Sequence, residues 1–391
     1  MQYPDSTFAL EILKVVSGAS LLLVVAAQGC VAVALGRRVR SGPRPPISVL
    51  KPLKGDEDDL YENLRALACQ RYPEFEILCG AEDPADPALA VVRRLAAEMP
   101  AVAIRIVCGG APIGLNPKVN NLAQLLPVAR HEVVLISDAN VRPPPDYLAG
   151  LADQLAEPGV GLVHSPLVGV HERSVGALLE HLHLAGFIIR SVCASVVLVD
   201  QPAVIGKSML MRRAQLEQVG GLAAVKDMLA EDYQLGRRFH AAGLRVVLAP
   251  QLLPTVAERW SVRRFLARHL RWSQMRRRQC PGWYMLEPLG YPGALALAVL
   301  LVSRGAAWPW TVAVLLAQVG LDAALWRRLR GQRLGWAALL LPLRDVLALA
   351  MWAVGLVKRG VEWRGHQFVM GPDSALQLPA AWASVQLEKV R

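Results

Sequence analysis

An uncharged apolar run from about Val15 to Leu35 constrains this chain more than any other feature of its sequence. It has roughly the 20 residues that a helix needs to cross a bilayer, so we expect a transmembrane helix within residues 1–36. A cleavable signal peptide has a shorter apolar stretch and a small-residue cleavage site, whereas a basic cluster follows here at residues 37–40. The positive-inside rule then places the chain after Gly36 in the cytoplasm.

The composition agrees with a protein that lies partly in the membrane. With 53% hydrophobic and 19% charged residues, the chain is too apolar for a purely soluble enzyme and too charged for a pure membrane bundle. The net charge of +11 is compatible with nucleic acid, but the basic residues lie beside apolar runs, as they do at membrane flanks. We therefore expect a lipid bilayer and no nucleic acid as a partner. The six cysteines lack CxxC spacing, which argues against zinc and against a disulfide scaffold.

Three further apolar runs follow toward the C-terminus, at about 289–302, 311–325 and 334–357. Three spans are the simplest count for this C-terminal membrane region, which we place at residues 284–360, before a tail at 361–391. The last run contains Arg344 and Asp345. Charges at that depth imply the interior of a bundle, a wet cavity or a re-entrant turn.

Between the membrane regions, residues 45–260 alternate short apolar runs with helical patterns. The predicted strands are at residues 47–50, 75–80, 104–107, 133–136 and 161–166. This alternation is typical of a parallel α/β sheet, whose ligands bind beyond the carboxyl ends of the strands. Asp83 follows the second of these strands and Asp138 follows the fourth. We therefore expect both carboxylates at the ligand-binding edge of the sheet.

A loop dense in polar side chains, residues 114–121, leads into a predicted helix that ends near Leu126. Lys118 at the start of that helix suits a phosphate or the hydroxyls of a sugar. A polar turn capped by asparagine explains the same residues. The later sequence Gly206-Lys207-Ser208 lacks the earlier glycine of a P-loop, which argues against an ATPase.

The acidic pair Glu231 and Asp232 opens another predicted helix, and a basic helix follows it at residues 261–283. The helix dipole favours acidic residues in a first turn, so the pair alone is weak evidence of catalysis. In the basic helix, apolar residues recur at helical spacing among arginines, as expected of a helix at a membrane surface. That helix contains the sequence RxxRW, formed by Arg268, Arg271 and Trp272.

These motifs together resemble the ceramide glucosyltransferase family, in the same order, over about residues 45–280. The resemblance rests on Lys51-Pro52-Leu53-Lys54-Gly55, Glu82-Asp83, the loop at 114–121, Asp138, Gly161-Leu162-Val163-His164, Glu231-Asp232-Tyr233 and Arg268, Arg271 and Trp272. It implies an α/β fold, namely a cytosolic nucleotide-diphosphate-sugar-binding domain of the glycosyltransferase A type with N-terminal and C-terminal transmembrane helices.

The resemblance also implies roles for particular residues. Asp83 is expected to contact uridine, Asp138 a divalent cation (Mg²⁺ or Mn²⁺) and the diphosphate, and Asp232 the acceptor hydroxyl as the catalytic base. The other expected nucleotide-sugar-binding residues are Lys51, Lys118, Asn120, Arg268, Arg271 and Trp272. Because Asp138-Ala139-Asn140 lacks the second carboxylate of a DxD motif, we expect the diphosphate to supply much of the cation's coordination.

The implied activity is transfer of a hexose, with glucose expected, from a UDP-sugar to the primary hydroxyl of a membrane lipid, with ceramide expected. One base without a nucleophilic carboxylate predicts direct displacement with inversion, which gives a β-linked glycolipid. The expected location is the bacterial inner membrane, as a multi-pass protein with its catalytic domain on the cytoplasmic side. Three alternatives stay open: a hopanoid or other lipid glycosyltransferase using UDP-N-acetylglucosamine or another UDP-sugar, a processive polysaccharide synthase, and a catalytically silent scaffold.

Overall fold

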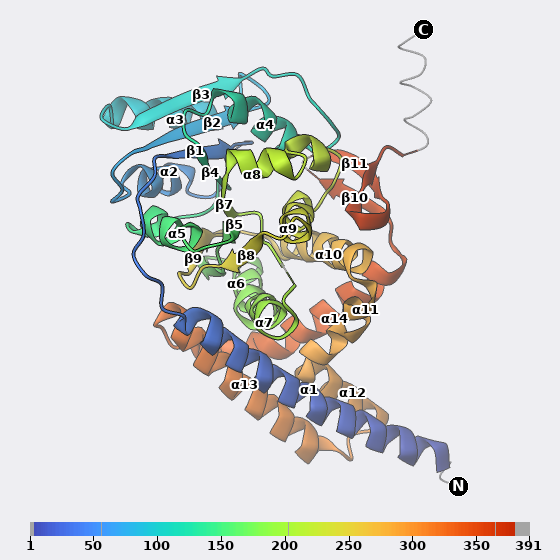
Figure 1. The fold of residues 1–391 in the computed structure, drawn as a ribbon. Coiled ribbons are helices and arrows are strands. Elements are labelled where there is room, and N and C mark those ends of the chain that lie inside the picture. The colour runs from blue at the N-terminus through green and yellow to red at the C-terminus, as the bar shows by residue number, and fades with distance from the viewer. Residues whose placement is uncertain (1–3, 56, 202, 364, 380–391) are drawn as a thin grey trace. The chain divides into compact units, whose positions relative to one another are not determined.

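The computed structural model describes residues 4–55, 57–201, 203–363 and 365–379, which form two compact units (Figure 1). The helical unit consists of Met1–Val33, His171–Val197 and Glu258–Arg359. The sheet unit consists of Ala34–Val170, Leu198–Ala257 and Gly360–Arg391. Each unit is therefore assembled from three separate stretches of the chain. Residues 171–197, inside the range predicted for the catalytic domain, belong to the helical unit.

Seven strands form the main sheet of the sheet unit: β1 (Ile47–Pro52), β2 (Phe75–Ala81), β3 (Ala103–Cys108), β4 (Val133–Ser137), β5 (Val160–His164), β7 (Ser208–Arg212) and β8 (Arg245–Leu248). Their spatial order is β3-β2-β1-β4-β7-β5-β8. The predicted alternation of strands and helices is confirmed, but the prediction of an all-parallel sheet is wrong, because β7 runs antiparallel to both β4 and β5. A parallel neighbour needs a crossover that carries the chain back to the end of the sheet where the previous strand began. The connection from β5 to β7 instead enters β7 at the end of the sheet where β5 finished.

Helices cover both faces of the main sheet: α2 (Leu60–Ala68), α3 (Ala88–Glu98), α4 (Pro117–Leu125), α5 (Tyr147–Leu155), α8 (Arg213–Gln218) and α9 (Glu231–Ala241). Successive residues of a strand point to opposite faces. Accordingly, Val49 of β1 packs in one buried cluster with Leu64 of α2, and Leu50 packs in another with Val119 of α4. Burial on both faces explains why the central strands are continuous apolar runs.

Two smaller sheets complete the sheet unit. They comprise β6 (Leu167–Val170) parallel to β9 (Leu253–Val256), and the antiparallel strands β10 (Gly360–Trp363), β11 (His366–Met370) and β12 (Leu376–Gln377). A short helical turn, η7 (Pro372–Ser374), connects β11 to β12. The predicted C-terminal tail therefore begins as an ordered part of this unit.

The helical unit contains α6 (Val175–His183), α7 (Ile189–Ala194), α10 (Val262–Gln279), α11 (Pro281–Leu286), α12 (Pro292–Val302), α13 (Trp308–Arg330), α14 (Leu341–Val357) and most of α1 (Pro4–Gly36). Two π-helical turns, η2 (Leu184–Ile188) and η3 (Ser195–Val199), continue α6 and α7. Two 3₁₀ turns, η5 (Glu287–Gly290) and η6 (Gly335–Leu340), precede α12 and α14.

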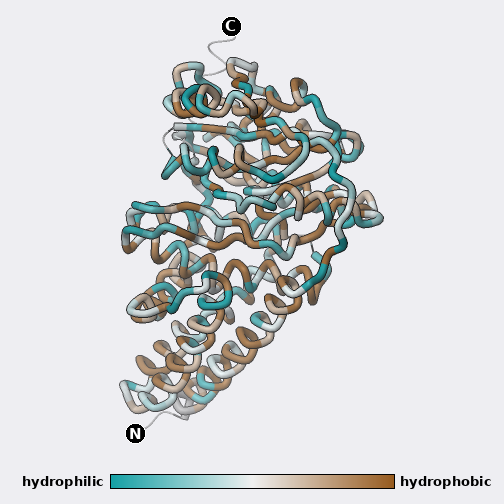
Figure 2. Tube along the Cα trace, turned by 90° about the vertical axis from the view of Figure 1, so that its left-hand side faces the viewer, coloured by the Kyte–Doolittle hydropathy of each residue, from teal (hydrophilic) through white to brown (hydrophobic). Residues whose placement is uncertain are grey.

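Among the described residues, four helices are long and apolar enough to cross a membrane: Phe8–Gly36, Val175–Val199, Trp308–Arg330 and Gly335–Val357. Figure 2 shows hydrophobic residues along these long helices. Three of them match predicted apolar runs, whereas the second lies inside the range predicted for the catalytic domain. The predicted span at 289–302 is broken instead, since Pro281–Gly290 and Pro292–Val302 meet at 69°. The break lies at Tyr291, because a residue before proline is disfavoured in the helical conformation.

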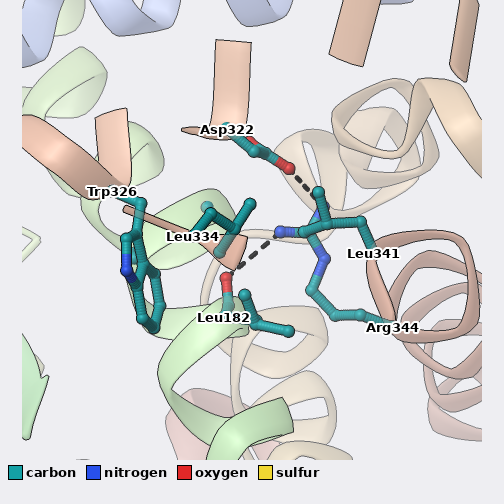
Figure 3. Close-up of a pocket in the computed structure, with 8 residues that line it drawn as sticks. Leu182, Asp322, Trp326, Leu334, Leu341 and Arg344 are labelled. Atoms are coloured by element: carbon teal, nitrogen blue, oxygen red, sulfur yellow. Dashed lines mark hydrogen bonds and ion pairs between the residues drawn. The ribbon is translucent and has the colours of Figure 1, made fainter. Parts of the chain in front are cut away.

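A buried ion-pair network lies inside the helical unit (Figure 3). Arg344 Nη2 lies 3.2 Å from Asp322 Oδ2 and 2.5 Å from Asp345 Oδ1. Its Nη1 donates to the carbonyl oxygen of Leu182 at 3.1 Å. Arg190 Nη1 donates to the other oxygen of Asp322 at 2.6 Å. Two arginines and two aspartates balance in charge. Of the three surroundings considered for Arg344 and Asp345, their burial favours the interior of a bundle.

Candidate active site

Lysine and carboxylate side chains meet in the sheet unit, where the loop after β4 lies beside the first turns of α4 and α9. The ammonium of Lys118 is central to this cluster. Its Nζ is 2.9 Å from Asp138 Oδ1, 2.9 Å from Glu231 Oε1, and donates to the carbonyl oxygen of Gly206 at 2.9 Å. Lys118 is only 6% exposed. Each of its three donors thus has an oxygen partner from a different part of the chain.

The position and charge of Lys118 follow from its surroundings. Asn116 caps α4, because its Oδ1 accepts from the backbone N–H groups of Lys118 at 2.9 Å and Val119 at 3.1 Å. Burial opposes the positive charge of Lys118, but the nearby carboxylates, Asp138 and Glu231 first among them, raise its pKa above the ordinary value. Lys118 is therefore a permanent cation among acidic groups.

Asp232, the predicted base, is held by two backbone donors in the first turn of α9. Its Oδ2 accepts from Gly206 N at 2.6 Å, and its Oδ1 accepts from Tyr233 N at 2.8 Å. Burial and the charge of Glu231 raise the pKa of Asp232 to about 7, against the opposing effects of Lys118 and the two N–H groups. A carboxyl group with a pKa near neutrality is suited to accept a proton in a reaction at neutral pH.

Gly206 makes this arrangement possible. A Cβ atom at position 206 would lie 2.8 Å from Asp232 Oδ2 and 3.0 Å from Lys118 Nζ. Real Cβ atoms essentially never approach other heavy atoms within 3.0 Å. Any larger residue at position 206 would therefore displace the Asp232 carboxylate, the Lys118 ammonium or the backbone that joins them.

Lys51 and Lys207 hold the backbone and amide groups that surround Asp138. Lys51 is fully buried, and its Nζ donates to Ser137 Oγ at 3.1 Å and to the carbonyl oxygen of Asp138 at 2.5 Å. Burial lowers the pKa of Lys51 to about 8. Lys207 Nζ donates to Asn140 Oδ1 at 2.5 Å. These lysines therefore fix the segment that carries Asp138 from inside the sheet unit.

Two predicted donor-binding residues have local roles in their loops. Asn120 Oδ1 accepts from Ile113 N at 2.9 Å and Gly114 N at 3.0 Å, which closes the polar loop before α4. Asp83 is exposed beyond the end of β2, and its Oδ1 accepts from Ala85 N at 2.8 Å. The cluster around Lys118 thus includes Asp138, while the contacts above place Asp83 in an exposed turn.

A divalent cation would find few protein ligands at Asp138. Among the described residues, there is no group of three or more His, Cys, Asp or Glu side chains that could hold a metal. Asp138 Oδ1 already lies 2.9 Å from Lys118 Nζ, and Asn140 Oδ1 accepts from Lys207. The Asp138 side chain is nevertheless 28% exposed. One carboxylate suits Mg²⁺ if water and substrate phosphates supply the other ligands.

The predicted RxxRW residues lie on α10, in the helical unit, and their surroundings there are aromatic and acidic. The guanidinium of Arg268 lies 4.5 Å from the ring centroid of Trp272, a cation–π distance. Its Nε is 3.5 Å from Oε1 of the buried Glu180, whose Oε2 lies 2.6 Å from His269 Nε2. Arg271 follows on the same helix and is half-buried. Arg268 is thus held between an indole ring and a carboxylate.

Several residues of the cluster were missed from the sequence. In the sequence, Glu231 is only the acidic neighbour of Asp232, yet in the structure it is 4% exposed and forms an ion pair with Lys118. Gly206 and Lys207 were considered only as part of a failed P-loop pattern. Asp227 had no signal at all, although its Oδ1 accepts from Leu115 N at 2.7 Å. No local spacing encodes such contacts, because their partners are far apart in the sequence.

Comparison with known proteins gives a family match over most of the chain. Glycosyl transferase family 21 matches residues 15–376. Ceramide glucosyltransferase 1 of Caenorhabditis elegans is 29% identical over 255 residues, which are 63% of this chain and 53% of that protein. Ceramide glucosyltransferase 3 of the same organism is 25% identical over 342 residues, which are 83% of this chain and 72% of that protein. The chain thus spans about half the length of the first of these relatives.

A solved structure has a similar fold. The mannosyltransferase PcManGT of Pyrobaculum calidifontis, in complex with GDP-mannose and Mn²⁺, aligns with 88% of this chain and 99% of its own. The TM-score is 0.51 and the sequence identity is 21%. This likeness concerns the fold, and it confirms the predicted glycosyltransferase A-type α/β architecture.

Proposed function

The chain belongs to glycosyl transferase family 21, and on that premise we propose that it transfers a hexose from a UDP-sugar to the primary hydroxyl of a membrane lipid. Glucose and ceramide are the sugar and the acceptor of this proposal, because the similar proteins of Caenorhabditis elegans are named ceramide glucosyltransferases. The product is a β-linked glycolipid, formed with inversion at the anomeric carbon.

The observation that carries the proposal is the environment of Asp232. Its pKa of about 7 arises from burial and from the neighbouring charge of Glu231. A primary alcohol is a weak nucleophile at neutral pH, so its attack needs a positioned base that takes the proton as the new bond forms. Each oxygen of Asp232 uses one lone pair on a backbone N–H, which leaves the other lone pair to accept that proton.

In the proposed reaction, the acceptor oxygen forms a bond to the anomeric carbon while the bond from that carbon to the diphosphate breaks. The hydroxyl proton passes to Asp232, and UDP leaves with the electron pair. Cationic groups stabilise the charge that develops on the leaving group. Lys118 supplies a permanent positive charge beside Asp138, and Arg268, Arg271 and Trp272 are proposed to contact the diphosphate and the edge of the acceptor.

Asp138 is the proposed protein ligand of a divalent cation, Mg²⁺ or Mn²⁺. When bound, such a cation neutralises charge on the diphosphate and so favours its departure. The proposed contact of Asp83 with uridine agrees with its exposed position past the end of β2, since ligands of such sheets bind beyond the carboxyl ends of the strands. Lys51 and Asn120 are proposed to support the donor site through the loops that they hold.

The proposed location is the bacterial inner membrane, with the catalytic domain, here the sheet unit, on the cytoplasmic side. The support is the basic cluster at residues 37–40, directly after the candidate span Phe8–Gly36. Labelling of single introduced cysteines in sealed vesicles tests this location. Labelling of the sheet unit from the cytoplasmic face is expected, and labelling from the opposite face alone would contradict it.

A transfer assay with the purified full chain tests the activity. The protein is incubated with labelled UDP-glucose, UDP-galactose or UDP-N-acetylglucosamine, each with ceramide or a hopanoid, and the glycolipid is identified by mass spectrometry. We expect a β-glucosylceramide. A product from the hopanoid alone would show that the acceptor is a hopanoid and not ceramide. A growing polysaccharide would identify a processive synthase. Binding of UDP-sugars without any transfer would indicate that the protein is a catalytically silent scaffold.

A further inference from the structure

The loop that leads into α9 is tied to the polar loop before α4. Residues 227–230 directly precede Glu231 and Asp232. On one side of this loop, Asp227 Oδ1 accepts from Leu115 N at 2.7 Å, and the carbonyl oxygen of Met228 accepts from Asn116 Nδ2 at 2.6 Å. The loop therefore connects the helix start that carries Lys118 with the helix start that carries Asp232.

The other side of the same loop is held by residues 373–376, which we call the C-terminal clasp. The backbone carbonyl oxygen of Ser374 accepts from Leu229 N at 2.9 Å, and its hydroxyl oxygen accepts from Ala230 N at 3.2 Å. Leu376 N donates to the carbonyl oxygen of Asp227 at 2.7 Å. Met228 and Ala375 form an antiparallel bridge between these contacts. The clasp thus pairs with the loop as a short added strand.

Ser374 also provides a cap that α9 lacks. The N-cap residue of α9 is Ala230, which has no side-chain acceptor. A hydroxyl oxygen from a residue 144 positions away instead accepts the backbone N–H of this N-cap residue. Asp232 lies two positions beyond Ala230, so the place of its carboxylate depends on where this helix begins.

The backbone of the clasp is itself unusual. Asp373 has φ 51° and Ser374 has φ 65°, so two consecutive residues other than glycine lie in the left-handed region. Such conformations persist where surrounding contacts determine them, and they cluster at functional sites. Ser374 is fully buried. The contacts to the 227–230 loop help to hold this conformation, together with the hydrogen bond that Gln234 Nε2 donates to the carbonyl oxygen of Asp373 at 3.1 Å.

We propose that Ser374 is a positioning residue of the active site, which holds the amides of Leu229 and Ala230 and thereby places Asp232 for proton acceptance. This inference rests on the proposed function of Asp232. The small C-terminal sheet is then part of the catalytic apparatus. In this proposal the sheet affects where the Asp232 carboxylate lies and does not change the positions of the donor-binding residues.

Two variants separate this role from general stability. Ser374→Gly removes the hydroxyl and is free of strain at φ 65°, so the chain is expected to fold. Ser374→Ala removes the hydroxyl and retains the strain. The matched control is Asp373→Asn, which removes the exposed ion pair with Arg237 while an asparagine tolerates the positive φ. Asp373→Asn leaves both acceptors of Ser374 unchanged.

The experiment measures transfer by the full chain in detergent, together with UDP affinity and amide hydrogen exchange. Both Ser374 variants are expected to lower kcat about 10-fold or more, since small displacements of a catalytic group have effects of this size, with the KM for the donor unchanged. The interactions of Asp232 with Gly206 and Lys118 lower its pKa, and its interaction with Glu231 raises it. A looser first turn of α9 should weaken the first two interactions more than the third, so the pKa of Asp232 should rise. The acidic limb of the kcat–pH profile should therefore move to higher pH.

Hydrogen exchange at Leu229 and Ala230 should become faster in both Ser374 variants and stay unchanged in Asp373→Asn. Unchanged exchange, or a kcat and pH profile equal to those of the control, would overturn the positioning role. A wild-type chain that transfers no sugar to any lipid would instead overturn the proposed function. In that case the exchange measurement still decides whether Ser374 holds the start of α9.

Discussion

The backbone N–H of Gly206 donates a hydrogen bond to Asp232 Oδ2 at 2.6 Å, and a Cβ atom at position 206 would lie 2.8 Å from the same oxygen. This contact joins a loop before β7 to the first turn of α9. The requirement for glycine therefore comes from the carboxylate beside it, since the backbone of Gly206 is not in the left-handed region.

Gly206→Ala is expected to lower turnover about 10- to 100-fold, because displacement of a catalytic group by about 1 Å has effects of this size. Steady-state transfer assays measure the change. Gly360→Ala is the matched control, because a Cβ atom there has no heavy atom within 4 Å. Wild-type turnover in Gly206→Ala would mean that Asp232 is not held by this contact during catalysis.

Asp232→Asn keeps the size of the side chain but cannot accept a proton at neutral pH. Turnover should fall by about 10²–10⁴-fold, the usual contribution of a positioned base, while UDP affinity measured by calorimetry changes little. Glu231→Gln is the comparison, because the Glu231 carboxylate is engaged by Lys118. If Glu231→Gln removes turnover and Asp232→Asn retains it, the base must be reassigned by one residue.

The pH dependence of kcat should have an acidic limb near neutrality. As the proposed base, Asp232 would act only when ionised, and burial and Glu231 raise its pKa to about 7, so kcat should rise with pH through this range. Glu231→Gln removes one of the charges that raise the pKa of Asp232, and the limb should then move to lower pH. A limb that stays in place in Glu231→Gln would show that another group controls the profile.

Asp138→Ala is expected to abolish donor binding or turnover, whereas a chelator should reduce turnover without necessarily eliminating it. The reason for the weaker effect of chelation is that Lys118 already provides a positive charge at Asp138. Calorimetry with UDP, with and without Mn²⁺, measures the binding. Full activity after exhaustive chelation would show that lysine and arginine side chains alone neutralise the diphosphate.

Gly186→Ala is expected to destabilise the helical unit by about 1–3 kcal/mol, the usual cost of overpacking. A Cβ atom at Gly186 would lie 2.1 Å from Arg344 Nη1, a group of the buried ion-pair network. The unfolding temperature in detergent reports the loss. Gly320→Ala on α13 is the control, because no heavy atom beyond the adjacent backbone lies within 4 Å of the added Cβ atom. Equal unfolding temperatures would mean that the network relaxes without cost.

Features of the chain that depend on local burial could be predicted from the sequence. The apolar run of α1 and the buried strands β1, β2 and β4 appear as continuous hydrophobic segments, because membrane or two covered faces surround them. The position of Asp138 after β4 followed from the same pattern, whereas that of Asp232 followed from the predicted start of a helix. The agreement of several motifs in order led to the family, which the match over residues 15–376 shows.

Features that depend on contacts between distant segments were decided only by the tertiary structure. Three such features join residues from separate stretches of the chain: the antiparallel pairing of β7, the ion pairs of Lys118 and the hydrogen bond from Ala230 N to Ser374. A hydrogen bond between residues 144 positions apart leaves no periodic pattern, because neither partner constrains the residues beside the other. The sequence alone therefore determined the first spanning helix, five strands of the main sheet and the family. Folding decided which side chains meet, since only folding makes distant residues neighbours.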